Sequence, residues 1–364
     1  MSTSTISDQC ITGEIIRYGP NRYSISSPTA QKTIYGHGAK FPKSPWYKTW
    51  SNPHPDQWSL FADQSITRHS ENRRQYQSAY TMSSLIHYES YVDECADLFS
   101  QRLKEVAHAG VFTDMGHWLQ CYAFDVIGLI TYSKRLGFLD AGDDISGVIA
   151  ALEDHLQYAT LVGIYSWLHP YLFAVRNWLA GSGGTGRAYV MKFTQERIAE
   201  HQREQRKGIP LHDDGSDAGI PTTTTMDFLT KFFSKNAQDP QAFTMYHLAS
   251  GCVSNMVAGS DTTAISLSAI LYYLLKNQCT FDTLRQEVDA LTLQQQRGEG
   301  RISRTTISFK ESQEMPYLQA VMKEALRMHP ATGLPLERVV PPGGATICDR
   351  YFPEGVSRIK GLFR

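Results

Sequence analysis

The 364-residue chain carries 35 lysines and arginines against 36 aspartates and glutamates, which gives a formal net charge of −1. This balance argues against the strongly basic character of nucleic-acid-binding proteins, so we expect no nucleic acid partner. Hydrophobic residues make up 41% of the chain and aromatic residues 11%, which argues against an intrinsically disordered protein. A chain of this length can bury a large core, either as one large domain or as two of ordinary size.

The cysteines form no CxxC pair, and most of them lie in apolar stretches with helical spacing. We therefore expect free, buried thiols in a reducing compartment. There are six, namely Cys10, Cys95, Cys121, Cys252, Cys279 and Cys348. The N-terminal residues show neither the apolar core of a secretory signal nor an arginine-rich amphipathic pattern, so we expect a cytoplasmic protein without a targeting signal.

The first predicted element is a β-hairpin. Two short segments with alternating apolar and polar residues, Glu14–Tyr18 and Arg22–Ser26, flank a Gly-Pro-Asn turn. After the hairpin the pattern becomes mostly helical. Apolar residues at helical spacing predict a helix over Ser83–Ala109, and Gly110 ends it.

Helices and connecting segments follow. Asp114 can cap a helix that runs to about Tyr132. Tyr158–Val175 has no formal charge but is interrupted by glycine and by His-Pro, so we expect a surface loop and helix that dip into a membrane interface. Gly181–Gly186 matches the dinucleotide-binding pattern GxGxxG, but the segment before it is helical in pattern, which favours a linker. The polar segment Lys207–Thr225 predicts a loop.

The long helix predicted over Thr244–Lys276 has Asp261 as its single formal charge inside these limits. Its polar residues make it costly in lipid, so we expect a helix in the protein core. Thr262 can donate a hydrogen bond to the carbonyl of Ala258 and loosen the helix there, while Gly259 leaves room for a small ligand. An acid beside an alcohol can then relay protons to a bound group. The alternative is a polar notch whose hydrogen bonds are satisfied internally.

The last predicted helix covers Gln313–Met328, with a proline in its first turn. Glu324 and Arg327 are three residues apart on it, a spacing that is common for exposed ion pairs. Extended segments with two Pro-Gly turns follow, and Arg338 is a basic residue among apolar ones in the first of them. The elements together predict a mainly α fold with a small β part.

A second pair of basic residues lies earlier in the chain. His69 and Arg73 are four residues apart, which places them on one face of a helix. An imidazole and a guanidinium at this spacing suit a ligand with two carboxylates. The alternative interpretation is a solvated basic turn.

Taken in this order, the motifs resemble those of the cytochrome P-450 monooxygenases, a haem-thiolate family. The resemblance rests on Ala-Gly-x-Asp-Thr-Thr, on Glu-x-x-Arg, on His-x-x-x-Arg at the place of a WxxxR motif, and on the basic residue after the Glu-x-x-Arg helix. Three segments are similar in sequence to the pisatin demethylase-like group of filamentous fungi, namely Tyr18–Ser26, Lys43–Tyr47 and Arg73–Leu85. The resemblance extends from about Gly13 to Gly355.

The resemblance implies the cytochrome P-450 fold and a haem-dependent monooxygenase of fungal secondary metabolism. Such an enzyme inserts one atom of dioxygen into a small apolar substrate and takes electrons from an NADPH-dependent cytochrome P-450 reductase. The implied residue roles are proton delivery by Asp261 and Thr262, haem contact by Ala258 and Gly259, propionate binding by His69, Arg73 and Arg338, and bracing of the core by Glu324 and Arg327. The uncharged Tyr158–Val175 region would belong to the substrate-access part, in peripheral contact with the endoplasmic reticulum membrane.

The sequence departs from the family pattern at both ends. We expect no transmembrane anchor, an incomplete cytochrome P-450 domain over residues 1–355 and a tail unrelated to the family over residues 356–364. No cysteine follows Cys348, which lies in the wrong segment to bind iron, so we expect no metal ligand and no carbon monoxide band of a thiolate-ligated haem. A catalytically inactive, truncated fragment is therefore the alternative function, and we expect the central helix to expose an apolar face that promotes aggregation.

Overall fold

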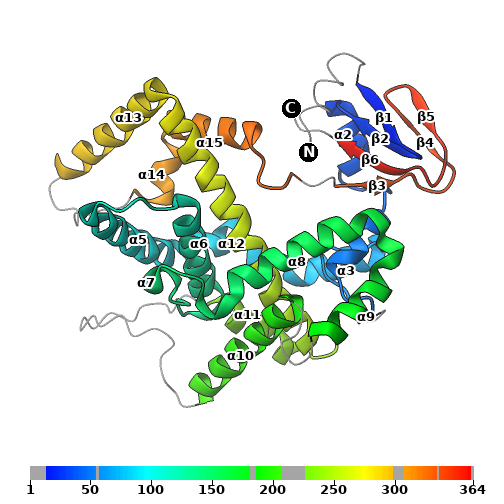
Figure 1. Cartoon of the computed structure of the whole chain (residues 1–364), viewed down its shortest axis with the longest axis horizontal. Coiled ribbons are helices and arrows are strands. Elements are labelled where there is room, and N and C mark those ends of the chain that lie inside the picture. Colours follow the sequence, from blue (N-terminus) through cyan, green and yellow to red (C-terminus); the bar gives the residue numbers. More distant parts are fainter. Residues whose placement is uncertain are drawn as a thin grey trace. The chain divides into compact units, whose positions relative to one another are not determined.

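The computed structural model describes residues 14–54, 57–180, 186–206, 226–297, 307–333 and 336–361. They belong to two compact units (Figure 1). Unit 1 comprises Met1–Gln75, Glu153–Thr185 and Thr332–Arg364, and unit 2 comprises Tyr76–Leu152 and Gly186–Ala331. The architecture is mainly α with two small sheets, as the sequence predicts.

Unit 1 holds the strands found in the described residues, together with a few helices. Its elements are β1 (Ile15–Gly19), β2 (Arg22–Ile25), α2 (Pro28–Tyr35), η1 (Pro45–Trp50), α3 (Ile66–Tyr76, whose last residue is in unit 2), η4 (Gly163–Leu168), α9 (His169–Ala180), β3 (Arg338–Val339), β4 (Ala345–Ile347), β5 (Arg350–Phe352) and β6 (Ser357–Gly361). Four strands form a sheet in the order β1-β2-β6-β3, and β4 pairs with β5. The sheet core contains Ile25, Ala30, Ile34, Val340, Ile347, Phe352 and Val356.

The sheet brings the two ends of the sequence together. The predicted hairpin is confirmed, because β1 and β2 pair antiparallel around Asn21, whose φ of 53° suits an asparagine in a tight turn. β6 lies between β2, to which it is parallel, and β3, to which it is antiparallel. The segment after Gly355, for which we predicted a tail unrelated to the family, supplies strand β6 to the main sheet.

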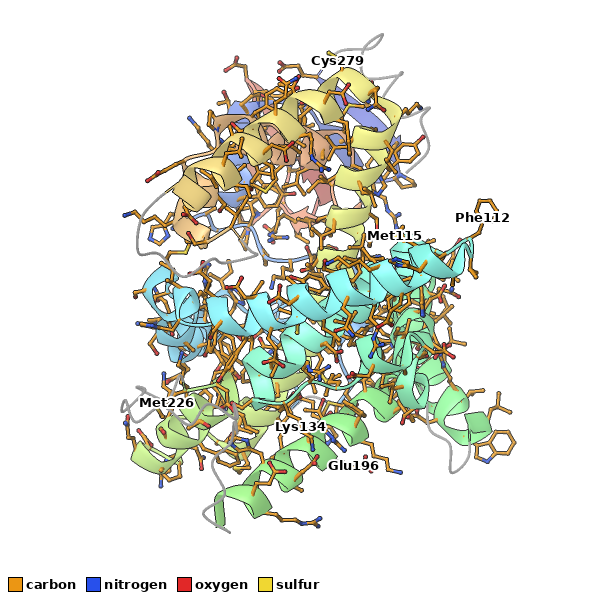
Figure 2. The ribbon with its side chains drawn as sticks, turned by 90° about the vertical axis from the view of Figure 1, so that its left-hand side faces the viewer. Phe112, Met115, Lys134, Glu196, Met226 and Cys279 are labelled. Atoms are coloured by element: carbon orange, nitrogen blue, oxygen red, sulfur yellow. The ribbon has the colours of Figure 1, made fainter. Side chains whose placement is uncertain are left out.

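Unit 2 is helical. Its elements are η2 (Gln77–Tyr80), α4 (Met82–Ile86), α5 (Glu89–Ala109), α6 (Met115–Tyr132), α7 (Phe138–Ala141), η3 (Ile145–Gly147), α10 (Gly186–Arg206), α11 (Phe228–Gln238), α12 (Met245–Lys276), α13 (Gln278–Arg297), α14 (Phe309–Gln313) and α15 (Pro316–Met328). Helix α8 (Val148–Val162) begins in unit 2 and ends in unit 1. The turn between α5 and α6 carries the fully exposed side chain of Phe112 (Figure 2).

Helix α12 organises unit 2. Thr244 caps it in a capping box with His247, as the predicted start of the helix requires. Its principal partner is α6. The two helices approach closely at Gly259, where an added Cβ would lie 2.9 Å from Cδ1 of Ile127. The glycine therefore permits the close packing of α12 on α6 at this point.

Two predicted helices have different limits. The single helix expected over Ser83–Ala109 is divided into α4 and α5 at Tyr88. This side chain is buried, donates a hydrogen bond to the carbonyl of Met226 (2.9 Å) and accepts one from Lys231 (2.7 Å), so tertiary contacts outweigh the local helical pattern. The last helix begins at Pro316 and not at Gln313.

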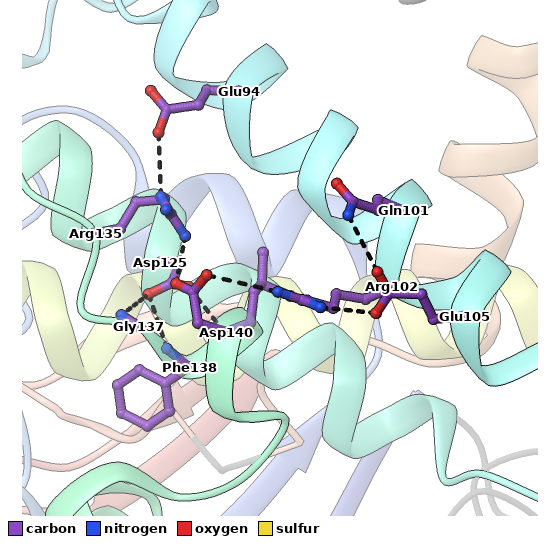
Figure 3. A network of polar contacts seen from close by, with 10 residues as sticks. Glu94, Gln101, Arg102, Glu105, Asp125, Arg135, Gly137, Phe138 and Asp140 are labelled. Carbon is purple, nitrogen blue, oxygen red and sulfur yellow. Dashed lines mark hydrogen bonds and ion pairs between the residues drawn. The ribbon is translucent and has the colours of Figure 1, made fainter. Parts of the chain in front are cut away.

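The buried carboxylate of Asp125 fixes the chain after α6 (Figure 3). Its Oδ1 accepts hydrogen bonds from the N–H groups of Leu136, Gly137 and Phe138, at 2.9, 2.8 and 3.2 Å. Its Oδ2 accepts one from Leu139 at 2.9 Å. Burial raises the pKa of this carboxyl group, and these N–H donors oppose the rise. A single acid thus satisfies four consecutive donors.

The remaining expectations concern cysteines, linkers and membranes. Cys95, Cys121 and Cys252 are buried free thiols as predicted, whereas Cys279 is exposed. Cys10 and Lys207–Thr225 lie outside the described residues, as does most of the GxGxxG segment, although the helix expected before it is present as α9. In the part of the chain that the structure describes, no helix is both long and apolar enough to cross a bilayer.

Candidate active site

The predicted site residues fall into two groups, one in each unit. In unit 1, helix α3 presents His69 and Arg73 one turn apart, with His69 half-buried and Arg73 exposed. The half-buried Arg338 in β3 donates from Nη1 to the hydroxyl of Tyr47 and to the carbonyl of Glu337, both at 3.1 Å. Its guanidinium carbon also lies 5.0 Å from the centre of the Tyr35 ring.

Lys43 interacts with two of these residues, and no sequence pattern indicated it as a site residue. It forms an isolated antiparallel β-bridge with Arg338. Its Nζ donates to the carbonyl oxygen of Leu60 at 2.7 Å. Burial, followed by the nearby charge of Arg338, lowers the pKa of Lys43 to about 8, against the opposing effect of Asp63. We call Lys43, His69, Arg73 and Arg338 the basic cluster.

His69 has an unsatisfied atom. Its Nδ1 is buried and has no hydrogen-bond partner in the described structure. Burial, together with the charge of Lys43, lowers the pKa of this imidazole. The buried Asp63 is the acid beside the cluster, but its carboxylate is engaged with Arg68, at 2.8 Å from both Nε and Nη2. Burial acts to raise the pKa of Asp63, and the bonds from Arg68 and the Ser65 N–H outweigh it.

The basic cluster suits an anionic ligand. A carboxylate that approaches the cluster would offset the charge of Arg338 that lowers the pKa of Lys43, and it would give the buried imidazole nitrogen of His69 a partner. The only sequence signal for Lys43 is its position just before the Ser-Pro-Trp-Tyr segment. This local position does not predict that Lys43 lies beside Arg338, because Arg338 is 295 residues away in the chain.

In unit 2, α12 carries the predicted acid and alcohol. The hydroxyl of Thr262 donates to the carbonyl of Ala258 at 2.6 Å, which confirms the expected bond. Ser260 and Ser266 make equivalent bonds, to Met256 at 2.6 Å and to Thr262 at 2.8 Å. The helix is nevertheless continuous from Met245 to Lys276, so the expected loosening is not seen.

Asp261 borders a cavity of about 400 Å³ inside unit 2. Residues from α6 and α12, together with the residue after α15, line it: Gly116, Gln120, Asp261, Ala264, Ile265, Ser268, Ala269, Tyr272, Tyr273 and His329. Asp261 and Thr262 are half-buried, and Ala258 is exposed on the same helix. The acid is therefore next to a volume that can hold water or a small ligand.

Glu324 and Arg327 do form the predicted ion pair. Two bonds of 2.7 Å join the guanidinium to the two carboxylate oxygens. The side chains are 59% and 52% exposed, so the pair lies on the surface of unit 2. The direct ion pair lowers the pKa of Glu324 and raises that of Arg327.

A second surface feature belongs to unit 1. The segment from the end of α8 through η4 to α9 exposes a run of aromatic and aliphatic side chains, which we call the aromatic patch. It consists of Leu161, Ile164, Tyr165, Trp167, Tyr171, Leu172, Val175, Trp178 and Leu179. Trp167 and Trp178 are 69% and 79% exposed. Exposed apolar patches of this kind mark surfaces that meet another apolar surface.

The chain was compared with known proteins. The family model described as Cytochrome P450 matches residues 16–359. A cytochrome P450 monooxygenase of Aspergillus terreus is 38% identical over 94% of this chain and 67% of its own length. Pisatin demethylase of Fusarium vanettenii is 36% identical over 94% of this chain and 62% of its own length. The cytochrome P450 monooxygenase cicH of Emericella nidulans is 34% identical. The chain spans about two thirds of the length of these relatives or slightly less.

Proposed function

This chain belongs to the cytochrome P450 family, and on that premise we propose that it works as a haem-dependent monooxygenase that inserts one atom of dioxygen into a small apolar molecule. Its relatives include fungal P450 monooxygenases and pisatin demethylase. We further propose a role in fungal secondary metabolism. The observation that carries the proposal is the basic cluster, which has a buried, unpartnered imidazole nitrogen among three cations.

The residues of unit 1 fit the acidic edge of a haem. Arg73 and Arg338 supply guanidinium groups that pair well with carboxylates, and His69 supplies the free Nδ1. These three residues would bind the propionates. When bound, the haem supplies the redox centre at which dioxygen is reduced. Within the described ranges, no three His, Cys, Asp or Glu side chains gather as they would around a protein-bound metal ion.

Asp261 and Thr262 would supply protons to the reaction. The carboxylate of Asp261 reaches the 400 Å³ cavity, where water can exchange protons with it. The hydroxyl of Thr262 already donates to Ala258, so its oxygen is available to accept a hydrogen bond. To donate a proton to a ligand, it must exchange that bond for a new one. Ala258 and Gly259 lie on α12 in the turn before Asp261 and Thr262, and they would face the haem next to these two residues.

The aromatic patch supports a peripheral contact with a membrane. Tryptophan and tyrosine side chains favour the interface between lipid headgroups and acyl chains. We propose that the protein works in the cytoplasm at the surface of the endoplasmic reticulum and takes its apolar substrate from that surface. Electrons would come from an NADPH-dependent cytochrome P450 reductase.

An isotope experiment tests this function. Haem-loaded protein is incubated with the reductase, NADPH and a set of small apolar fungal metabolites under ¹⁸O₂, and products are analysed by mass spectrometry. The proposal expects NADPH-dependent products with one ¹⁸O atom, or their dealkylated successors. Haem binding without any NADPH-dependent product would contradict it and would favour a catalytically inactive haem-binding fragment.

A further inference from the structure

Lys43 is a half-buried lysine of unit 1 to which no function has been assigned so far. It precedes η1 and pairs through its backbone with Arg338 of β3. Its ammonium group lies 5.6 Å from the centre of the Tyr47 ring, and the guanidinium of Arg338 lies 5.7 Å from the same ring. The two cations therefore share one aromatic neighbour.

The groups around Lys43 do not neutralise it. Asp63 is the acid that acts on it most, but two hydrogen bonds engage this carboxylate with Arg68. The buried carboxylate of Glu337 accepts a hydrogen bond from Ser44 at 2.9 Å, and Tyr18 is a further partner of it. The charge of Arg338 lowers the pKa of Lys43, and the charge of Lys43 in turn lowers that of His69.

The ammonium group of Lys43 has donor hydrogens with which it can bind an anion. Its bond to the Leu60 carbonyl uses one of three donor hydrogens, at 2.7 Å. The Nδ1 of His69, whose pKa responds to Lys43, is buried and unpartnered in the described structure. A carboxylate placed between these groups would offset the charge repulsion and satisfy the imidazole.

We propose that Lys43 is a carboxylate-binding residue, which acts with His69 and Arg338 on one acidic group of an aromatic dicarboxylate of the porphyrin class. The inference rests on the proposed function, because it concerns the same ligand. It goes beyond that function by adding a fourth residue to His69, Arg73 and Arg338, the three that the motifs assign to carboxylate binding. It also makes the binding dependent on pH: ligand binding should weaken once Lys43 loses its proton, which in the free protein occurs at about pH 8.

The test uses iron-free protoporphyrin IX, which has two free carboxylates, and its dimethyl ester, in which both are blocked. Binding to the full chain is followed at pH 7 by quenching of tryptophan fluorescence. Lys43→Met should weaken binding of the diacid about tenfold, the value of one charge-assisted hydrogen bond, and should leave the ester unchanged. Lys48→Met is the matched control, because Lys48 is exposed on η1 and should have no effect.

Two further results distinguish a binding role from a structural one. Lys43→Arg keeps the charge and should restore binding of the diacid at pH 7. At pH 9.5 the wild-type protein should bind the diacid as weakly as Lys43→Met, while Lys43→Arg keeps its affinity. Equal losses for diacid and ester, or equal affinities of Lys43→Met and Lys48→Met, would overturn the inference. Because no iron or turnover is involved, a failed ¹⁸O experiment leaves this result independent.

Discussion

The hydroxyl of Thr262 lies 2.6 Å from the carbonyl oxygen of Ala258, one turn earlier in α12, and donates a hydrogen bond to it. The bond gives the hydroxyl of Thr262 a hydrogen-bond partner within the helix. The acid Asp261 is the preceding residue of the same helix. It also defines the change that proton transfer requires, because the hydroxyl must turn away from Ala258 before it can donate elsewhere. The helix itself stays intact.

Gly259→Ala should destabilise unit 2. The new methyl group would lie 2.9 Å from Cδ1 of Ile127 in α6, so the two helices must separate or a side chain must move. We expect a loss of about 1–3 kcal/mol in the free energy of unfolding, measured by urea denaturation. Ile127→Ala should recover part of this loss in the double variant. If the two losses are simply additive, the close helix approach is not the cause.

Asp125→Asn should also be destabilising. The amide offers one acceptor oxygen in place of two, so at least one of the four buried N–H donors loses its partner. The expected cost is about 1–3 kcal/mol in urea denaturation. Asp140→Asn is the control, because Asp140 is 47% exposed in its ion pair with Arg135 and such pairs contribute about 0–1 kcal/mol. Equal effects of the two substitutions would contradict the assignment.

The depressed pKa of Lys43 has a consequence for stability. Between about pH 8 and 10.5 the unfolded chain still holds the proton that the folded chain has lost. The contribution of Lys43 to the free energy of unfolding therefore rises with pH in this window, and below it the buried charge costs at most about 3 kcal/mol. Lys43→Met should flatten the pH profile of stability measured by chemical denaturation. A slope equal to that of wild type and of Lys48→Met would refute this.

The aromatic patch predicts binding to lipid vesicles. Trp167→Ser and Trp178→Ser should each weaken sedimentation with phospholipid vesicles, by about tenfold, since burying such a side chain contributes about 1.5–3 kcal/mol. Phe112→Ser is the control, because Phe112 is more exposed than either tryptophan but lies in the α5–α6 turn of unit 2 (Figure 2). If Phe112→Ser reduces binding as much as the tryptophan variants do, the patch is not the membrane-binding surface.

The sequence predicts the elements whose signal is local. The limits of the long helix Thr244–Lys276, the hairpin around Asn21 and the proline in the first turn of α15 were all apparent from short patterns, and the structure confirms them. The bond from Thr262 to Ala258 is local too. By contrast, the division at Tyr88 depends on Lys231 and Met226, which are more than a hundred residues away.

The same limit applies to the candidate site. Residue spacing predicts that His69 and Arg73 share a helix face, but nothing local places Lys43 beside Arg338. The close approach of Gly259 to Ile127 could not be predicted for the same reason, since Ile127 is on another helix. The Glu324–Arg327 pair was predicted from its spacing, whereas its exposure depends on which residues surround it in the fold.

The central claim is that Asp261 and Thr262 deliver protons in a P450 reaction. Its most direct measurement is the fraction of NADPH electrons recovered in product and in hydrogen peroxide, for haem-loaded protein with reductase. Thr262→Val removes the hydroxyl and keeps the shape, so product per NADPH should fall at least tenfold while peroxide rises. Thr263→Val, at the exposed neighbouring residue, should change neither. Coupling in Thr262→Val equal to that in Thr263→Val would contradict the claim.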